Sequence, residues 1–217
     1  MSINILFLSE NLLVIDKPVG IAVECPEDHG IALWKTVQKH HKGFLNCHRI
    51  DKNTSGLVIF ATDALRAYIM RNWHEISHKS YLSIILNPPW SETVCDREVE
   101  TDKGLKSAVT TFRVLDRSRG LALVQCDLTQ NGRKHQIRQH LAFLERPILG
   151  DLVYKGEPTR ARRGQLLHAY QLDLDLPGEK VHFQAPIPRD FKTAFRSGIW
   201  SRLDQDSSSI LGSLGNP

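Results

Sequence analysis

Residues 48–56, HRIDKNTSG, and the run that follows them, LVIFA at 57–61, are the most informative part of this 217-residue chain. The run is short, apolar and rich in β-branched residues, which is typical of a buried strand. The ionisable side chains of His48, Arg49 and Asp51 lie just before it. Because a charge is costly to bury unless it is paired, this order predicts an ion pair or a functional site where the strand begins.

The composition describes an ordinary globular protein, 41% hydrophobic and 24% charged, with a net charge of +4 that permits an anionic partner without requiring one. No apolar run reaches the roughly 18 residues of a membrane-spanning helix, and the first residues do not resemble a signal peptide. The four cysteines are far apart and form no CxxC pair. We therefore expect reduced thiols in a cytoplasmic protein without a metal site.

Hydrophobic periodicity predicts strands and helices that alternate without strict βαβ repetition. The expected helices are 31–41, 63–76 (with Asp63 as the N-cap) and 134–144, and a turn is expected at 104–106. The expected strands are 12–15, 57–61, 81–86, 108–115, 121–128, 166–176 and 180–185, the last four as two hairpins. This order predicts an α+β fold with a mixed, largely antiparallel central sheet flanked by helices.

Residues 1–200 are expected to form one domain, because the chain contains no repeat and no low-complexity linker. The tail 201–217 is rich in serine and glycine and is expected to be disordered.

Basic residues gather in a second segment, GRKHQIR at 132–138. Charged runs are usually solvated surface, but Ile137 suggests a half-buried helix, which favours a paired arginine. A further basic run contains Lys155, Arg160, Arg162 and Arg163, with only Glu157 against it. Two basic runs that flank the same segment favour phosphate binding modestly.

Residues 48–57 closely resemble the signature of the RluA-type RNA pseudouridine synthases, in the short form without an N-terminal RNA-binding module. In that family the aspartate of this motif is the catalytic residue, which corresponds to Asp51. Segment 132–138 resembles the family's GRxHQ[I/L]R motif, which implies that Arg138 pairs with Asp51. Lys79-Ser80-Tyr81 resembles its KxY element, whose tyrosine contacts the target uracil.

Four further segments follow the family's order: DKPVG at 16–20, KSAVT at 106–110, RPILGDLVY at 146–154 and LHA at 167–169. The last implies that Leu167 lines the base pocket. The resemblance extends over about residues 12–191 and implies the pseudouridine synthase catalytic fold. Asn131 and the pair Glu145-Arg146 depart from the family pattern, so the RNA target is open.

The chemistry implied is the cleavage of a glycosidic bond, rotation of the uracil and its reattachment through C5, without a cofactor or a metal. A carboxylate could attack the substrate or remove a ribose proton, and the sequence leaves both routes open. An aspartate in a partly desolvated pocket stays ionised only beside a fixed cation, a task that suits arginine.

The target base must be flipped out of a folded RNA. Arg49 is well placed to fill the vacated stack, because a guanidinium can stack on bases. His48 either bonds a phosphate or holds the loop, and Arg133 either contacts phosphate or acts as a clamp. Lys134 and His135 complete the expected RNA-binding set, together with Leu167.

Three other functions fit the sequence less well. A non-catalytic RNA-binding protein would need the cleft but not Asp51, Tyr81 and Arg138. A glycosidic-bond hydrolase would need a second acid, and Asp151 is expected instead to cap local backbone in a Gly-Asp turn. A protein kinase is excluded by the lack of a Gly-rich phosphate loop and of Asp-Phe-Gly. The expected partner is a tRNA or rRNA stem-loop, bound by a monomer.

Overall fold

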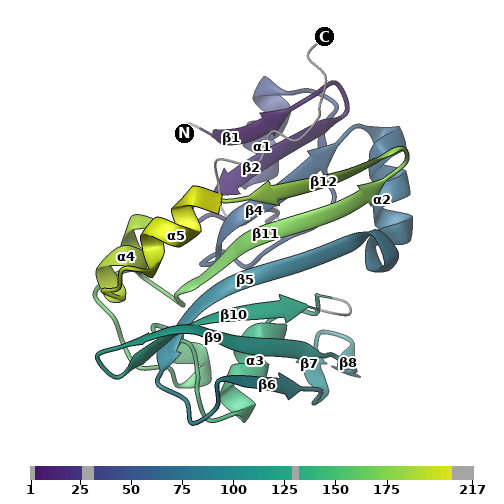
Figure 1. The fold of residues 1–217 in the computed structure, drawn as a ribbon. Coiled ribbons are helices and arrows are strands. Elements are labelled where there is room, and N and C mark those ends of the chain that lie inside the picture. Colours follow the sequence, from purple (N-terminus) through teal and green to yellow (C-terminus); the bar gives the residue numbers. More distant parts are fainter. Residues whose placement is uncertain (1–2, 26–31, 129–131, 207–217) are drawn as a thin grey trace.

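The computed structural model describes residues 3–25, 32–128 and 132–206 (Figure 1). A ten-stranded sheet runs in the order β1-β2-β4-β11-β5-β10-β9-β6, with β12 beside β11 and β3 beside β4. Its strands are β1 (Asn4–Leu8), β2 (Leu12–Lys17), β3 (Leu45–Asn46), β4 (Ser55–Ala61), β5 (Ser77–Leu86), β6 (Glu92–Cys95), β9 (Thr110–Ser118), β10 (Leu121–Leu128), β11 (Leu167–Leu176) and β12 (Glu179–Gln184). A separate hairpin joins β7 (Val99–Thr101) to β8 (Gly104–Lys106).

The helices are short and lie around the sheet: α1 (Leu33–His40), α2 (Asp63–Ile76), α3 (Gln136–Phe143), the 3-10 turn η1 (Leu152–Tyr154), α4 (Arg189–Ala194) and α5 (Ile199–Asp206). In Figure 1, α4 and α5 lie together at one side of the sheet, and α3 lies near β9 and β10. All the described strand pairs are antiparallel except β4 with β11. The predicted α+β class and the largely antiparallel sheet are therefore confirmed.

Three local predictions were wrong. Residues 104–106 form strand β8, and the turn lies at 102–103. Asp63 is the first residue of α2, whose N-cap is Thr62, and no side chain caps this end of the helix. Helix α5 covers residues 201–206 and crosses the expected boundary at residue 200.

The amphipathic pattern of α5 explains the last of these errors. Ile199, Trp200 and Leu203 are buried against the core, so the polar tail begins later than its serines suggest. Residues 207–217 lie outside the described residues, as do Ile31, at the start of the first expected helix, and Asn131.

The parallel pair β4–β11 is the feature that positions the functional residues. It is short: His168 pairs with Ser55, and Ala169 pairs with Gly56. Because the two strands run in the same direction, the loops that precede them meet at one edge of the sheet. Strand β5 lies on the other side of β11, where Tyr81 pairs with Ala169. Residues before β4, at the start of β11 and within β5 are thereby brought together.

Every residue of β4 is buried, and β2 beside it is almost as fully buried, which agrees with the apolar run in the sequence. No helix within the described ranges is both long enough and apolar enough to cross a membrane.

Gly56 is the residue that allows β4 and β11 to approach. Its φ is +107°, and a Cβ built on it would lie 2.1 Å from the carbonyl oxygen of Ala169. We expect Gly56→Ala to lower the free energy of unfolding by roughly 3 kcal/mol, from overpacking and backbone strain together. Gly178→Ala is the matched control, since Gly178 has a φ of +86° but open space around it. That variant should lose only about 1 kcal/mol, and equal losses in urea unfolding of both variants would contradict the role of close approach.

Candidate active site

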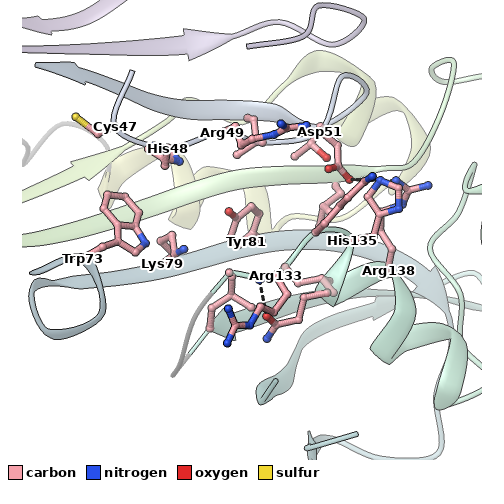
Figure 2. Close-up of a pocket in the computed structure, with 18 of the residues that line it drawn as sticks. Cys47, His48, Arg49, Asp51, Trp73, Lys79, Tyr81, Arg133, His135 and Arg138 are labelled. Atoms are coloured by element: carbon pink, nitrogen blue, oxygen red, sulfur yellow. Dashed lines mark hydrogen bonds and ion pairs between the residues drawn. The ribbon is translucent and has the colours of Figure 1, made fainter. Parts of the chain in front are cut away.

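A cavity of about 470 Å³ lies where these segments meet. Its walls come from the loop before β4, the end of α2, the start of β5, and the segment that leads into α3 (Figure 2). The residues predicted from the sequence all line it: His48, Arg49, Asp51, Tyr81, Arg133, Lys134, His135, Arg138 and Leu167. The fold thus gathers side chains that are up to 119 positions apart in the chain (48 to 167).

The predicted ion pair between Asp51 and Arg138 is present. Nη1 of Arg138 donates to Oδ2 of Asp51 over 3.1 Å. The arginine side chain is only 6% exposed, whereas that of Asp51 is 26% exposed and faces the cavity. The carboxylate therefore has a fixed cation on one side and an accessible site on the other.

Asp151 forms a second ion pair with Arg138, through guanidinium nitrogens that Asp51 does not contact. Nε and Nη2 of Arg138 donate to the two carboxylate oxygens of Asp151 over 2.6 and 2.8 Å, and the Asp151 side chain is 1% exposed. Burial opposes the charge of Arg138, but Asp151 and then Asp51 outweigh it and raise the pKa of the guanidinium. The prediction that Asp151 caps local backbone was wrong, because its side chain makes no cap bond. Its Gly-Asp context resembled a turn and gave no sign of a partner 13 residues away.

His135 and Tyr154 complete the surroundings of Asp51. Nε2 of His135 lies 3.6 Å from Oδ2 of Asp51, and its Nδ1 lies 3.0 Å from the hydroxyl of Tyr154. The Tyr154 ring also faces the guanidinium of Arg138, at 5.0 Å. Burial lowers the pKa of His135 more than the Asp51 charge raises it, so the ring is mostly neutral at pH 7. The sequence grouped His135 with RNA contacts, and the structure places it against the carboxylate.

Lys17 is hydrogen-bonded to the backbone next to Asp51. It is fully buried, and its ammonium donates to the carbonyl oxygens of Pro18, Ile21 and Lys52 over 2.8 to 3.2 Å. Burial lowers its pKa to about 7. Since Lys52 follows Asp51 directly, these bonds fix the backbone beside the carboxylate. The motif at 16–20 was identified in the sequence, but the hydrogen-bond partners of Lys17 were not predicted.

The side chain of His48 makes contacts within the protein that hold the loop. Its Nε2 accepts the backbone N–H of Ile59 over 3.2 Å, and its ring stacks on Trp73 with centroids 5.0 Å apart. Burial, with the nearby charge of Lys79, lowers its pKa to about 3. A neutral imidazole whose Nε2 already accepts a hydrogen bond is suited to holding the loop. The geometry therefore favours this role over the predicted alternative, a bond to a phosphate.

Tyr81 and Leu167 are two of the apolar residues that line the cavity. Both are at least nine-tenths buried, and Tyr81 rises from β5 between the Asp51 loop and Arg133 (Figure 2). Burial, reinforced by the Asp51 charge, raises the pKa of the tyrosine hydroxyl above its usual value. The phenol therefore stays protonated and can donate a hydrogen bond.

The basic residues fall into two kinds. Arg49 is exposed at the cavity, and Lys134 is exposed in an ion pair with Asp102. Arg133 is half-buried and donates to the carbonyl of Ser107 over 3.4 Å, which fits a clamp. The arrangement offers a carboxylate paired with an arginine, a neutral hydrogen-bond donor and exposed cations around one cavity.

The basic run at 155–163 does not act as a unit. Arg162 is 8% exposed, forms a bidentate pair with Asp190 and donates to the hydroxyl of Ser55. Its assignment to phosphate binding was wrong, and charge reversal at this position would disrupt the interior. Lys155, Arg160 and Arg163 are exposed and do not line the cavity.

Comparison with known proteins agrees with this geometry. Residues 11–143 match the RNA pseudouridylate synthase family. The chain is 32% identical to an uncharacterized RNA pseudouridine synthase of Bacillus subtilis, YlyB, over 88% of this chain and 71% of that protein. It is 28% identical to ribosomal large subunit pseudouridine synthase D of Xanthomonas campestris, over 95% and 71% of the two chains.

Among solved structures, the human RNA pseudouridylate synthase domain containing 4 superimposes with a TM-score of 0.72. That match covers 87% of this chain and 90% of the human one at 26% identity. The fold, the cavity and these matches lead to one conclusion: the chain belongs to the RNA pseudouridine synthase family and is an enzyme that isomerises uridine in RNA.

Proposed function

We propose that the enzyme modifies specific uridines in a structured RNA stem-loop, with Asp51 as the catalytic carboxylate and no cofactor. The observation that carries this proposal is the accessible Asp51 carboxylate, paired with the buried Arg138 in a cavity that also holds Tyr81. The size and apolar walls of the cavity suit a planar base with polar edges.

In this mechanism Arg138 pairs with the Asp51 carboxylate and holds it in place while the flipped uridine displaces water from the cavity. Asp51 then acts on the nucleotide, either as a nucleophile or as the base that removes a ribose proton. Tyr81 contacts the uracil while it rotates, and its protonated hydroxyl donates to the base. Both routes need the same ionised carboxylate.

Arg49 is the residue that we assign to the vacated place in the RNA stack. It is exposed, stands two residues before Asp51 and lines the same cavity. A guanidinium plane can replace a base in the stack, which compensates part of the cost of flipping, a few kcal/mol.

The RNA itself is proposed from the relatives. Several are named as synthases of the large ribosomal subunit, which favours a ribosomal stem-loop over a tRNA as the substrate. The alternative, a non-catalytic RNA-binding protein, would not need an arginine held by one buried carboxylate and directed at a second, accessible one.

Replacement of the catalytic carboxylate tests the mechanism. Asp51→Asn should lower kcat by about 10³-fold or more, because neither route works with an amide. Turnover would be followed as tritium released from C5-tritiated RNA isolated from cells that lack the gene. Affinity for the same RNA should stay within a few-fold, since the amide preserves the shape of the side chain.

The control is Asp175→Asn, a carboxylate at the β11–β12 turn that pairs with exposed Lys180. It should behave as the wild type. Substantial turnover by the Asp51→Asn enzyme would remove Asp51 from the chemistry.

Asp151 is a positioning residue in this account, since it holds Arg138 without facing the substrate. Asp151→Asn removes the charge that orients the guanidinium, and we expect kcat to fall by about 10- to 100-fold. KM should change little, because no RNA contact is lost. A raised KM with an unchanged kcat would show instead that Asp151 serves RNA binding.

A further inference from the structure

One end of the cavity has no part in the chemistry proposed above. Beyond Tyr81, away from Arg138, lie Trp73 of α2 and Lys79 of β5 (Figure 2). Met70, three residues before Trp73 on the same helix, also lines the cavity. Met70 is 50% exposed although it is large and apolar. Met70 and Trp73 give the cavity an apolar surface near a buried cation, a combination that suits a ligand with both apolar and anionic parts.

Lys79 is the unusual residue of this group. It is 9% exposed, and its ammonium lies 5.0 Å from the centre of the Trp73 ring. The ammonium also lies against Gly132, where a Cβ would come within 2.7 Å of it. Within the described ranges no carboxylate comes within ion-pair distance of Lys79.

The charge state of Lys79 follows from this setting. Burial lowers its pKa to about 8, so the side chain is still mostly protonated at pH 7. Among the described residues, the Trp73 ring is the one group seen to compensate this buried positive charge, an arrangement more often found at functional sites than in a core.

Lys79 lies on the same strand, β5, as Tyr81, the residue to which we assign the contact with the uracil. Lys79 and Tyr81 are two residues apart on one strand, so their side chains lie on the same face, with Cα atoms about 7 Å apart. A strand of RNA whose uridine reaches Tyr81 has its adjoining backbone within reach of Lys79. The neighbouring group is a phosphodiester, which supplies the missing negative charge.

We propose that Trp73, Met70 and Lys79 form a subsite for the RNA segment that adjoins the target uridine, in which the Lys79 ammonium donates to a phosphodiester oxygen. This inference rests on the proposed function. It assigns the apolar surfaces of Trp73 and Met70 to the sugar and base of the same neighbouring nucleotide. The subsite would make the enzyme select a polynucleotide over free uridine.

The competing role is purely structural, with Lys79 as a clamp on Trp73. The two roles predict opposite effects on stability. Removal of an uncompensated buried charge leaves stability unchanged or raises it, whereas removal of a clamp lowers it. Lys79→Met separates them, because methionine fills most of the same volume without the charge.

The experiment measures tritium release from C5-tritiated total RNA of cells that lack the gene, for wild type, Lys79→Met and Lys39→Met. Lys39 is an exposed lysine of α1 outside the cavity and serves as the control for loss of one charge. For Lys79→Met we expect KM to rise by about tenfold or more, as for a lost charge-assisted hydrogen bond, with kcat within twofold. The slope of log(kcat/KM) against log salt should shrink by about 0.7, one phosphate contact on single-stranded RNA.

Thermal unfolding of the same proteins completes the test, and Tm of Lys79→Met should equal or exceed that of the wild type. A lowered Tm with an unchanged salt slope would establish the clamp and overturn the subsite. Unchanged KM and slope would overturn it as well. Failure of the wild type itself to release tritium from any RNA would remove the proposed function, and the subsite with it.

Discussion

The guanidinium of Arg138 joins two carboxylates of very different exposure, and the candidate active site depends on that difference. Asp151, almost fully buried, takes the bidentate face and compensates most of the cost of burying the arginine. Asp51 accepts a hydrogen bond from Nη1 and stays open to the cavity. Without Asp151 the guanidinium would lose the two hydrogen bonds made by Nε and Nη2. The buried carboxylate therefore fixes the position of the cation that pairs with the accessible Asp51.

This arrangement is possible because the sheet brings distant segments to one edge. The short parallel pairing of β4 with β11 aligns the Asp51 loop with Leu167, and the antiparallel pairing of β11 with β5 adds Tyr81. Gly56 permits the first of these contacts, and Lys17 fixes the loop backbone beside Asp51. A cavity built in this way has one end near Arg138, where we place the chemistry, and a second end near Trp73, where no carboxylate of the described residues pairs with Lys79.

The sequence predicted the sheet class and the main strands from local hydrophobic periodicity, whereas the Asp51–Arg138 pair, 87 positions apart, followed only from the resemblance of residues 132–138 to a family motif. It did not predict that Asp151 holds Arg138, or that Arg162 is buried against Asp190, because these pairs join residues 13 and 28 positions apart and only the fold decides them. The residues adjacent in the sequence do not distinguish a buried, paired arginine from an exposed one. The partners of Lys17 and Lys79 were missed for the same reason: burial of a lysine depends on neighbours that no single segment contains.

The central claim is that this enzyme converts a particular uridine to pseudouridine through Asp51. The most direct measurement is transcriptome-wide pseudouridine mapping in cells that lack the gene, compared with the same cells that express the wild type or Asp51→Asn. The account predicts at least one site in ribosomal RNA or tRNA that is modified only when the wild type is expressed. A site restored equally by both proteins, or no site that depends on the gene, would contradict it.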